Sequence, residues 1–171
     1  MRLSREGGSN LAPSEADRGG KSASQEHLAS RTEDFAVLLD KARDFHGHLG
    51  PFLVLGLRAG LRGLRELQTR KESLDVSAKV RLTYSLPYSC ILDGVQVATG
   101  CTIGNRRLTY ENSPNPMILF QNRTGRAVAI SIVQETIDEL MRQLAKDAPE
   151  EEAAYKAAAM TEEELFKVSP F

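Results

Sequence analysis

Two histidines stand one residue apart in the stretch FHGHLGPF, where His46 and His48 flank a glycine and precede the pair Gly50-Pro51. Histidine is the commonest metal ligand in proteins and a frequent general base. In a regular helix the two side chains would point about 200° apart, whereas extended backbone would turn them to one side. The glycine and the coming helix break favour extended backbone, so the two imidazoles can face one site. The alternative is a pair of loop histidines satisfied by backbone carbonyls.

The second group of candidate residues lies in SCILDGVQVATGCTIGN, residues 89–105, which holds both cysteines of the chain. Ser89 is a suitable N-cap, so Cys90 falls in the first turn of a predicted helix, where the helix dipole is expected to lower the thiol pKa. Asp93 follows one turn later on roughly the same face. We therefore treat Asp93 as a candidate acid or base, or as a carboxylate that orients a metal ligand.

A loop that contains two glycines follows this helix and is a candidate ligand-binding loop. Glycine lets backbone N–H groups approach a bound molecule closely, because it has no Cβ atom. The residues with this candidate cofactor-binding role are Thr99, Gly100, Thr102 and Gly104.

The spacing of the two cysteines limits what they can do together. Cys90 and Cys101 are eleven residues apart, and a regular helix between them separates them by roughly 15 Å. Two sulfur atoms on one zinc ion lie within about 4 Å of each other, and a disulfide needs Cα atoms within about 7 Å. One cysteine is therefore a candidate metal ligand beside His46 and His48, or a second copy of the chain supplies the other thiol. A buried structural thiol is the alternative for each.

The composition is that of an ordinary globular domain and argues against several classes of protein. The 171 residues are 41% hydrophobic and 26% charged, with a formal net charge of −1, so no nucleic-acid partner is expected. Two cysteines are too few for a four-cysteine iron–sulfur cluster or zinc ribbon. No apolar run approaches the roughly 18 residues that span a bilayer, and the N-terminus shows no apolar signal segment. We expect a cytoplasmic protein with reduced thiols and no membrane partner.

The elements that must position these residues begin after an N-terminal arm. Residues 1–30 are rich in glycine, serine, alanine and charge and are predicted to be disordered. A helix is predicted from Thr32 to about Phe45. A second helix begins at Pro51, with Gly50 as its cap. The apolar face of the first helix is expected to comprise Phe35, Leu38, Leu39 and Ala42.

Three glycines, Gly56, Gly60 and Gly63, fall on one side of the second helix. Each costs roughly 1 kcal/mol relative to alanine within a helix, so a compensating contact is expected. We predict that another backbone packs closely against this side. The alternative is a helix that is merely weak.

The remaining pattern predicts an α+β domain, with a mostly antiparallel sheet of about four strands and helices packed on it. We expect a core domain over residues 31–148 and an acidic helical extension over residues 149–171, with one or two short outer helices. The predicted strands are 76–86, 107–111, 117–123 and 127–133, and the predicted helices are 90–99, 134–146 and one or two within 150–166.

Together the two motifs resemble the core domain of the FmdE family, named after the E subunit of formylmethanofuran dehydrogenase. That family shows Phe-His-Gly-His-x-Cys-Pro near its start, against Phe45 to Pro51 here. It then shows a segment like Cys-x-x-Asp-x-x-Gln-x-x-Thr-Gly-Cys-Thr-x-Gly, against Cys90 to Gly104. The resemblance covers about residues 33–145, and its second segment is long and specific.

The resemblance implies an α+β core, a homodimer, and a metal, commonly zinc, near the histidine and cysteine motifs. It also implies a link to the molybdenum or tungsten enzyme that reduces CO2 onto methanofuran. Two departures stand out. Gly50 replaces a cysteine of many members, so one ligand available to them is missing, and the absence of any cysteine after Cys101 removes the zinc-finger tail of some members.

Three functions follow from these residues. The first is a stand-alone metal-binding domain with an open coordination position for an unknown small-molecule substrate, in which Cys90 or Cys101 joins His46 and His48 and Asp93 orients a ligand. The second is a non-catalytic accessory subunit of a redox complex, because the chain has no cluster cysteines and no obvious pterin-binding region. The third is a small-molecule binding domain without a metal.

Overall fold

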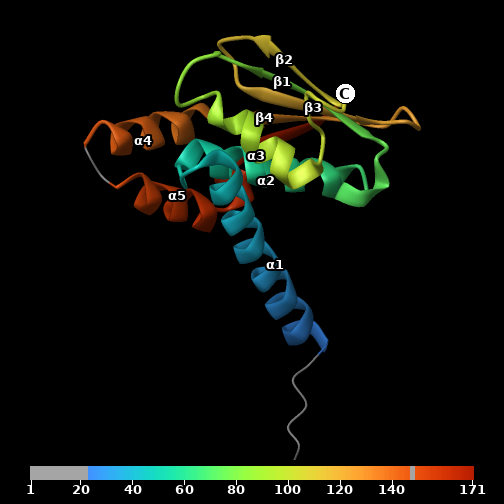
Figure 1. Ribbon diagram of the computed structural model, residues 1–171, viewed down its shortest axis with the longest axis horizontal. Coiled ribbons are helices and arrows are strands. Elements are labelled where there is room, and N and C mark those ends of the chain that lie inside the picture. Colours follow the sequence, from blue (N-terminus) through green and yellow to red (C-terminus); the bar gives the residue numbers. More distant parts are fainter. Residues whose placement is uncertain (1–22, 147–148) are drawn as a thin grey trace, which may run out of the picture.

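The computed structural model describes residues 23–146 and 149–171 and shows an α+β domain, as predicted (Figure 1). Within these residues one sheet has five strands rather than about four. The strands are β1 (Val76–Leu82), β2 (Leu108–Asn112), β3 (Met117–Asn122), β4 (Ala127–Ile132) and β5 (Phe166–Pro170). The helices are α1 (Ala23–His46), α2 (Pro51–Glu66), α3 (Cys90–Thr99), α4 (Gln134–Leu144), α5 (Glu150–Ala159) and α6 (Glu162–Leu165), with a short 3₁₀ turn at Lys71–Ser73.

The sheet has the strand order β2-β1-β3-β4-β5 and is mostly antiparallel. The exception is the parallel pair β1 and β2, which α3 connects, because parallel neighbours need a crossover. Alternate residues of β1, including Val80 and Leu82, are buried, whereas Lys79 on the other face is exposed. One face of the sheet therefore packs on the helices, and Figure 1 shows α2 and α3 beneath it.

The C-terminal residues, expected as an outer helical extension, are packed into the domain. β5 pairs with β4, where Val168 lies opposite Ile130 and Phe166 lies opposite Ile132. The sequence did not indicate this strand, because it is short, ends in Ser169-Pro170 and tolerates the proline only at a sheet edge. Three alanines of α5 are buried, in a helix that packs against α2. They are Ala153, Ala154 and Ala157.

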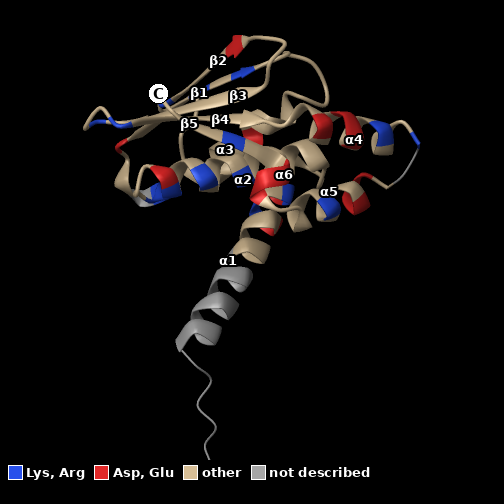
Figure 2. Ribbon diagram, turned by 180° about the vertical axis from the view of Figure 1, so that it is seen from behind, with Lys and Arg blue, Asp and Glu red and all other residues tan. Residues whose placement is uncertain are grey.

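Ion pairs also tie the C-terminal helices to α2. Glu162 at the start of α6 accepts from both Arg62 and Arg65 of α2. Figure 2 shows the acidic residues of α6 beside the basic residues of α2.

Glycines let α2 and α3 pack backbone against backbone. A Cβ atom at Gly56 would lie 2.1 Å from the carbonyl oxygen of Ile91, and one at Gly94 would lie 2.2 Å from that of Leu53. The predicted close packing is therefore confirmed at Gly56, and Gly94 of α3 makes the reciprocal approach. At Gly63 the neighbour is instead the ring of Phe120, 2.3 Å from the added Cβ. This packing fixes the start of α3 next to the residues before α2.

The first described helix differs from the prediction at its start but not at its end. α1 begins at Ala23 rather than Thr32, and it ends at His46. Of the predicted disordered arm, residues 1–22 lie outside the described residues, and residues 23–30 belong to α1. Its predicted apolar face packs on the core, with Ala42 fully buried. Neither α1 nor any other described helix combines the length and apolar character needed to cross a membrane.

Candidate functional site

The two histidines of the first motif converge at the end of α1. Gly47 follows the helix with φ of +93°, and its N–H donates to the carbonyl of Arg43 at 2.7 Å. This left-handed residue turns the chain, so the rings of His46 and His48 lie 4.6 Å apart between centroids, tilted by 39°. The predicted convergence is confirmed, although a left-handed glycine produces it rather than extended backbone.

Asp93 holds His46 in place from the first turn of α3. Its Oδ2 lies 2.7 Å from Nδ1 of His46, and its Oδ1 accepts from Nε2 of Gln96 at 3.0 Å. An ionised carboxylate only accepts hydrogen bonds, so this contact places the ring proton on Nδ1 and leaves the lone pair on Nε2. A carboxylate that orients a metal ligand or a general base makes this contact.

The other ring nitrogen of His46 is buried and unpaired. Nε2 is shielded from solvent, and no hydrogen-bond partner for it exists among the described residues. The whole side chain is 12% exposed. A buried polar atom without a partner costs roughly 1–3 kcal/mol. An ion or ligand bound at this atom would offset that cost.

His48 and Glu150 form the outer side of the site. Nε2 of His48 lies 3.1 Å from Oε2 of Glu150 at the start of α5, and both side chains are about half exposed. A Cβ atom at Gly50 would lie 3.4 Å from Nε2 of His48 and 3.7 Å from that glutamate oxygen. The carboxylate of Glu150 therefore lies where a cysteine at position 50 would reach.

Sequence reasoning did not single out Glu150, because nothing local links the start of α5 to the histidine motif. The signal that was available is Gly50 itself, where resemblance to the family implies a missing ligand. A search for a replacement would have needed the tertiary contact.

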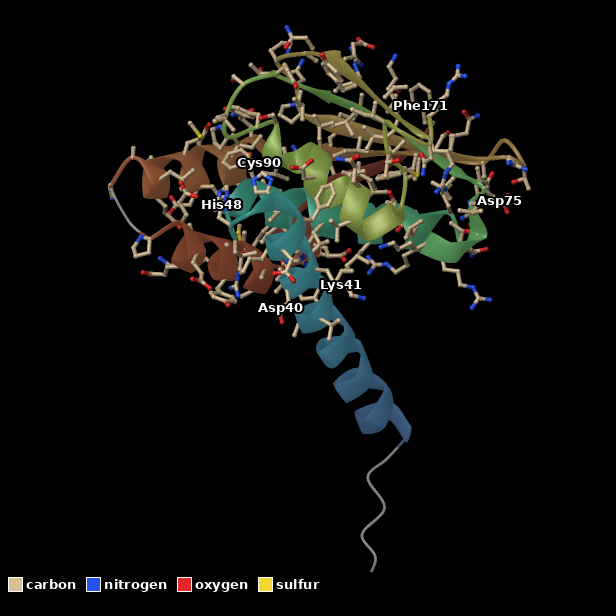
Figure 3. The ribbon with its side chains drawn as sticks, in the orientation of Figure 1. Asp40, Lys41, His48, Asp75, Cys90 and Phe171 are labelled. Atoms are coloured by element: carbon tan, nitrogen blue, oxygen red, sulfur yellow. The ribbon has the colours of Figure 1, made fainter. Side chains whose placement is uncertain are left out.

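Cys90 is the first residue of α3 and is buried beside two carboxylates. Burial raises the pKa of its thiol, and the negative charges of Asp93 and Glu150 raise the pKa further. The expectation that the helix dipole lowers this pKa is wrong, because desolvation and the carboxylates outweigh the helix start. Figure 3 shows Cys90 and His48 on the same flank of the domain.

Cys101 lies at the opposite end of α3 from Cys90, away from the histidines. It is fully buried, and its Sγ donates to the carbonyl of Val76 at 3.2 Å. The ten-residue helix between the two thiols spans about 15 Å. This position matches the alternative of a structural thiol.

The predicted ligand loop is closed by its own hydrogen bonds. The buried hydroxyl of Thr99 donates to the carbonyl of Val95 at 2.7 Å and accepts from the N–H of Cys101 at 3.0 Å. The carbonyl of Gly100, which has φ of +69°, accepts from side chains of Asn105 and Arg107. Thr102 bonds to Asn105 through both its N–H and its hydroxyl, and Gly104 is exposed. The structure does not bring this loop to the histidines.

The contacts at the histidines form a chain of pairs rather than a preformed cage. Asp93 contacts His46, the ring of His46 lies against that of His48, and His48 contacts Glu150. Within residues 23–146 and 149–171, no three His, Cys, Asp or Glu side chains are already gathered as metal ligands. The carboxylates nevertheless give the site a negative charge that favours a cation.

Comparison with known proteins places this arrangement in a family. The family described as "FmdE, Molybdenum formylmethanofuran dehydrogenase operon" matches residues 45–169, from the start of the histidine motif into β5. A probable S-adenosyl-L-methionine-binding protein of Archaeoglobus fulgidus is 32% identical over 101 residues, which are 58% of this chain and 28% of that protein. The chain thus spans little more than a quarter of that relative.

A solved structure shares the fold. The crystal structure of an FmdE-like protein of tungsten formylmethanofuran dehydrogenase, from Syntrophus aciditrophicus, matches with a TM-score of 0.54 at 21% identity. The match covers 78% of this chain and 69% of that one. At this identity the likeness shows the fold alone.

Proposed function

This chain belongs to the FmdE family, and on that premise we propose that its histidine–cysteine site binds one divalent transition metal ion, zinc by its donor set. The observation that carries the proposal is the buried, unpartnered Nε2 of His46, whose opposite ring nitrogen is held by Asp93. Metal-binding histidines are held by a carboxylate in this way.

The residues that would hold the ion are His46, His48 and Cys90. Cys101 is left out of this set, because it is buried against Val76 at the other end of α3. When bound, a zinc ion with three protein ligands supplies a Lewis acid at an open position. Glu150 now holds Nε2 of His48, so His48 must leave this carboxylate to turn toward the ion.

Protons link the site to its ligand. His46 offers a lone pair without losing a proton, because Asp93 keeps the proton on Nδ1. Cys90 must lose its proton to bind, and its raised pKa makes that step harder at neutral pH. Binding therefore releases a proton from Cys90 and strengthens as the pH rises.

The wider role extends the proposal. We take the chain to act as a stand-alone cytoplasmic homodimer on a small-molecule substrate, a ligand class supported by the name of the archaeal relative. The alternative role is an accessory subunit of a formylmethanofuran-dehydrogenase-type redox complex, which the names of the family and of the solved neighbour support.

One observation favours a third candidate, a small-molecule binding domain without metal. Among the described residues no set of three ligands is gathered beforehand. In that case the Asp93–His46 pair is a hydrogen-bond acceptor or general base, since Nε2 carries the lone pair.

Cobalt substitution tests the proposal directly. Co²⁺ added to the purified chain should produce a thiolate-to-cobalt charge-transfer band in the near ultraviolet, which reports a Cys–metal bond. Cys90→Ser should abolish the band, and Cys101→Ser is the matched control that should retain it. A band that survives Cys90→Ser, or no band in the folded wild-type chain, would rule out Cys90 as a ligand.

A further inference from the structure

A hollow of about 440 Å³ lies on the outer face of the sheet, at the edge where β3 and α4 begin. Its lining comes from β1, β3, β4, β5, the β2–β3 loop and the first turn of α4, and it contains none of the residues of the proposed metal site. The sheet separates it from α2 and α3, which cover the other face. It is therefore a second, independent location for a ligand.

Four lining residues form one continuous row across the sheet. Arg81 of β1 lies opposite Met117 of β3, Met117 lies opposite Ser131 of β4, and Ser131 lies opposite Lys167 of β5. Adjacent strands are about 4.8 Å apart, so roughly 14 Å separates the Cα atoms of the two basic residues. Two long cationic side chains thus flank the hollow from opposite ends.

The charges around Arg81 leave a positive surplus at one end. Glu111 is shared between Lys79 at 2.7 Å and Arg81 at 3.2 Å, so these three side chains sum to one positive charge. Both cations lower the pKa of Glu111 and keep it ionised. Arg81 retains a free donor, because its Nε is shielded from solvent and has no partner among the described residues.

Two further features favour an anion in the hollow. Lys167 at the other end makes no ion pair within the described part of the chain. α4 starts at the hollow with Val133 as its N-cap, and no side chain caps the first turn. Glu135 is the acidic member of the lining and reduces the surplus without cancelling it.

The rest of the lining is apolar and selects against small inorganic ions. It consists of Pro116, Met117, Ile132 and Val133. The volume falls within the usual range for small-molecule sites.

We propose that this hollow binds a small molecule with one carboxylate or phosphate group on an apolar body. The anionic group lies between Arg81 and Lys167 near the start of α4, and the apolar body lies against Met117 and its neighbours. The site goes beyond the proposed metal centre and does not depend on it.

Amide NMR titration of the full chain with phenyl phosphate tests this assignment, with benzyl alcohol as the neutral counterpart. Saturable shifts are expected in residues 134–136 and at the start of β3. Arg81→Gln and Lys167→Gln should each weaken binding by about fivefold or more. Arg126→Gln removes the same charge at the exposed β3–β4 turn, outside the lining, and should leave the affinity unchanged.

Each further result decides the matter. Binding that persists in His46→Ala supports a site separate from the metal centre. Equal affinity for benzyl alcohol, shifts that map elsewhere, or an unchanged affinity in the Arg81→Gln, Lys167→Gln double variant would overturn the proposal. Both substituted side chains are partly exposed, and the spectrum itself reports whether each variant is folded.

Discussion

Replacement of Asp93 by asparagine isolates the role of the carboxylate that holds His46. The change preserves the shape of the side chain and removes its charge. In the structure Asp93 makes a charge-assisted contact of 2.7 Å with Nδ1 of His46 and a second contact with Gln96. Without the carboxylate, nothing fixes the proton on Nδ1, and the tautomer with a proton on Nε2 cannot bind a metal.

The size of the effect follows from comparable contacts. Loss of a carboxylate that orients a histidine ligand lowers metal affinity by about 10- to 100-fold, which corresponds to about 1.4–2.7 kcal/mol. The stability cost should be only about 1 kcal/mol, because Asp93 is one-third exposed and keeps one neutral hydrogen bond. The metal affinity should therefore fall far more than the melting temperature.

Two assays measure these quantities, and Gln96→Ala is the matched control. Zinc affinity is measured by competition with a chromophoric chelator, and the histidine tautomer by long-range ¹H–¹⁵N NMR of the ring. Gln96→Ala leaves the His46 contact intact and should change the zinc affinity by less than about threefold. Wild-type zinc affinity together with a wild-type tautomer in Asp93→Asn would refute the role assigned to this carboxylate.

Three further predictions concern packing and protonation. Gly94→Ala should destabilise the chain by about 3 kcal/mol or more in urea unfolding, because its Cβ would lie 2.2 Å from a backbone oxygen, whereas Gly104→Ala, with its nearest atom at 3.8 Å, should change stability by less than about 0.5 kcal/mol; equal losses would contradict the close approach. Cys90 in metal-free protein should react with iodoacetamide more slowly than a free cysteine at pH 8, because burial and then Asp93 raise its pKa, and Asp93→Asn should speed the reaction; a fast reaction in the wild type would show that the pKa is not raised. Burial of Glu162 favours its neutral form, but hydrogen bonds from Arg65 and Arg62 outweigh burial and lower its pKa below 4.5, so its contribution to stability is present above that pH and is lost as the pH falls through the folded pKa; Glu162→Gln should flatten the acid side of the stability curve followed by circular dichroism, and an unchanged curve would count against the pair.

The sequence predicted those parts of the molecule whose signals are local. The period of apolar residues located α2, and alternation located β1. The glycines of α2 indicated a close neighbour, which Gly56 confirms against Ile91. The two-residue spacing of His46 and His48 indicated convergence, since a glycine between them allows the left-handed turn that the structure shows.

The parts that sequence reasoning missed depend on contacts between distant segments. β5 forms only because β4 offers an edge, and its five residues show no clear pattern of their own. Glu150 reaches His48 from the other end of the chain. The raised pKa of Cys90 depends on burial and on two carboxylates from different helices, whereas the sequence showed only the helix start.

The measurement that tests the central claim most directly is the metal content of the purified, untagged chain by elemental mass spectrometry. We predict about one zinc or other transition metal ion per chain. The ion should be lost in the His46→Ala, His48→Ala double variant and retained in His27→Ala, which removes the third histidine of the chain. A folded wild-type chain that stays metal-free after supplementation with zinc, or a double variant with full occupancy, would contradict the metal site.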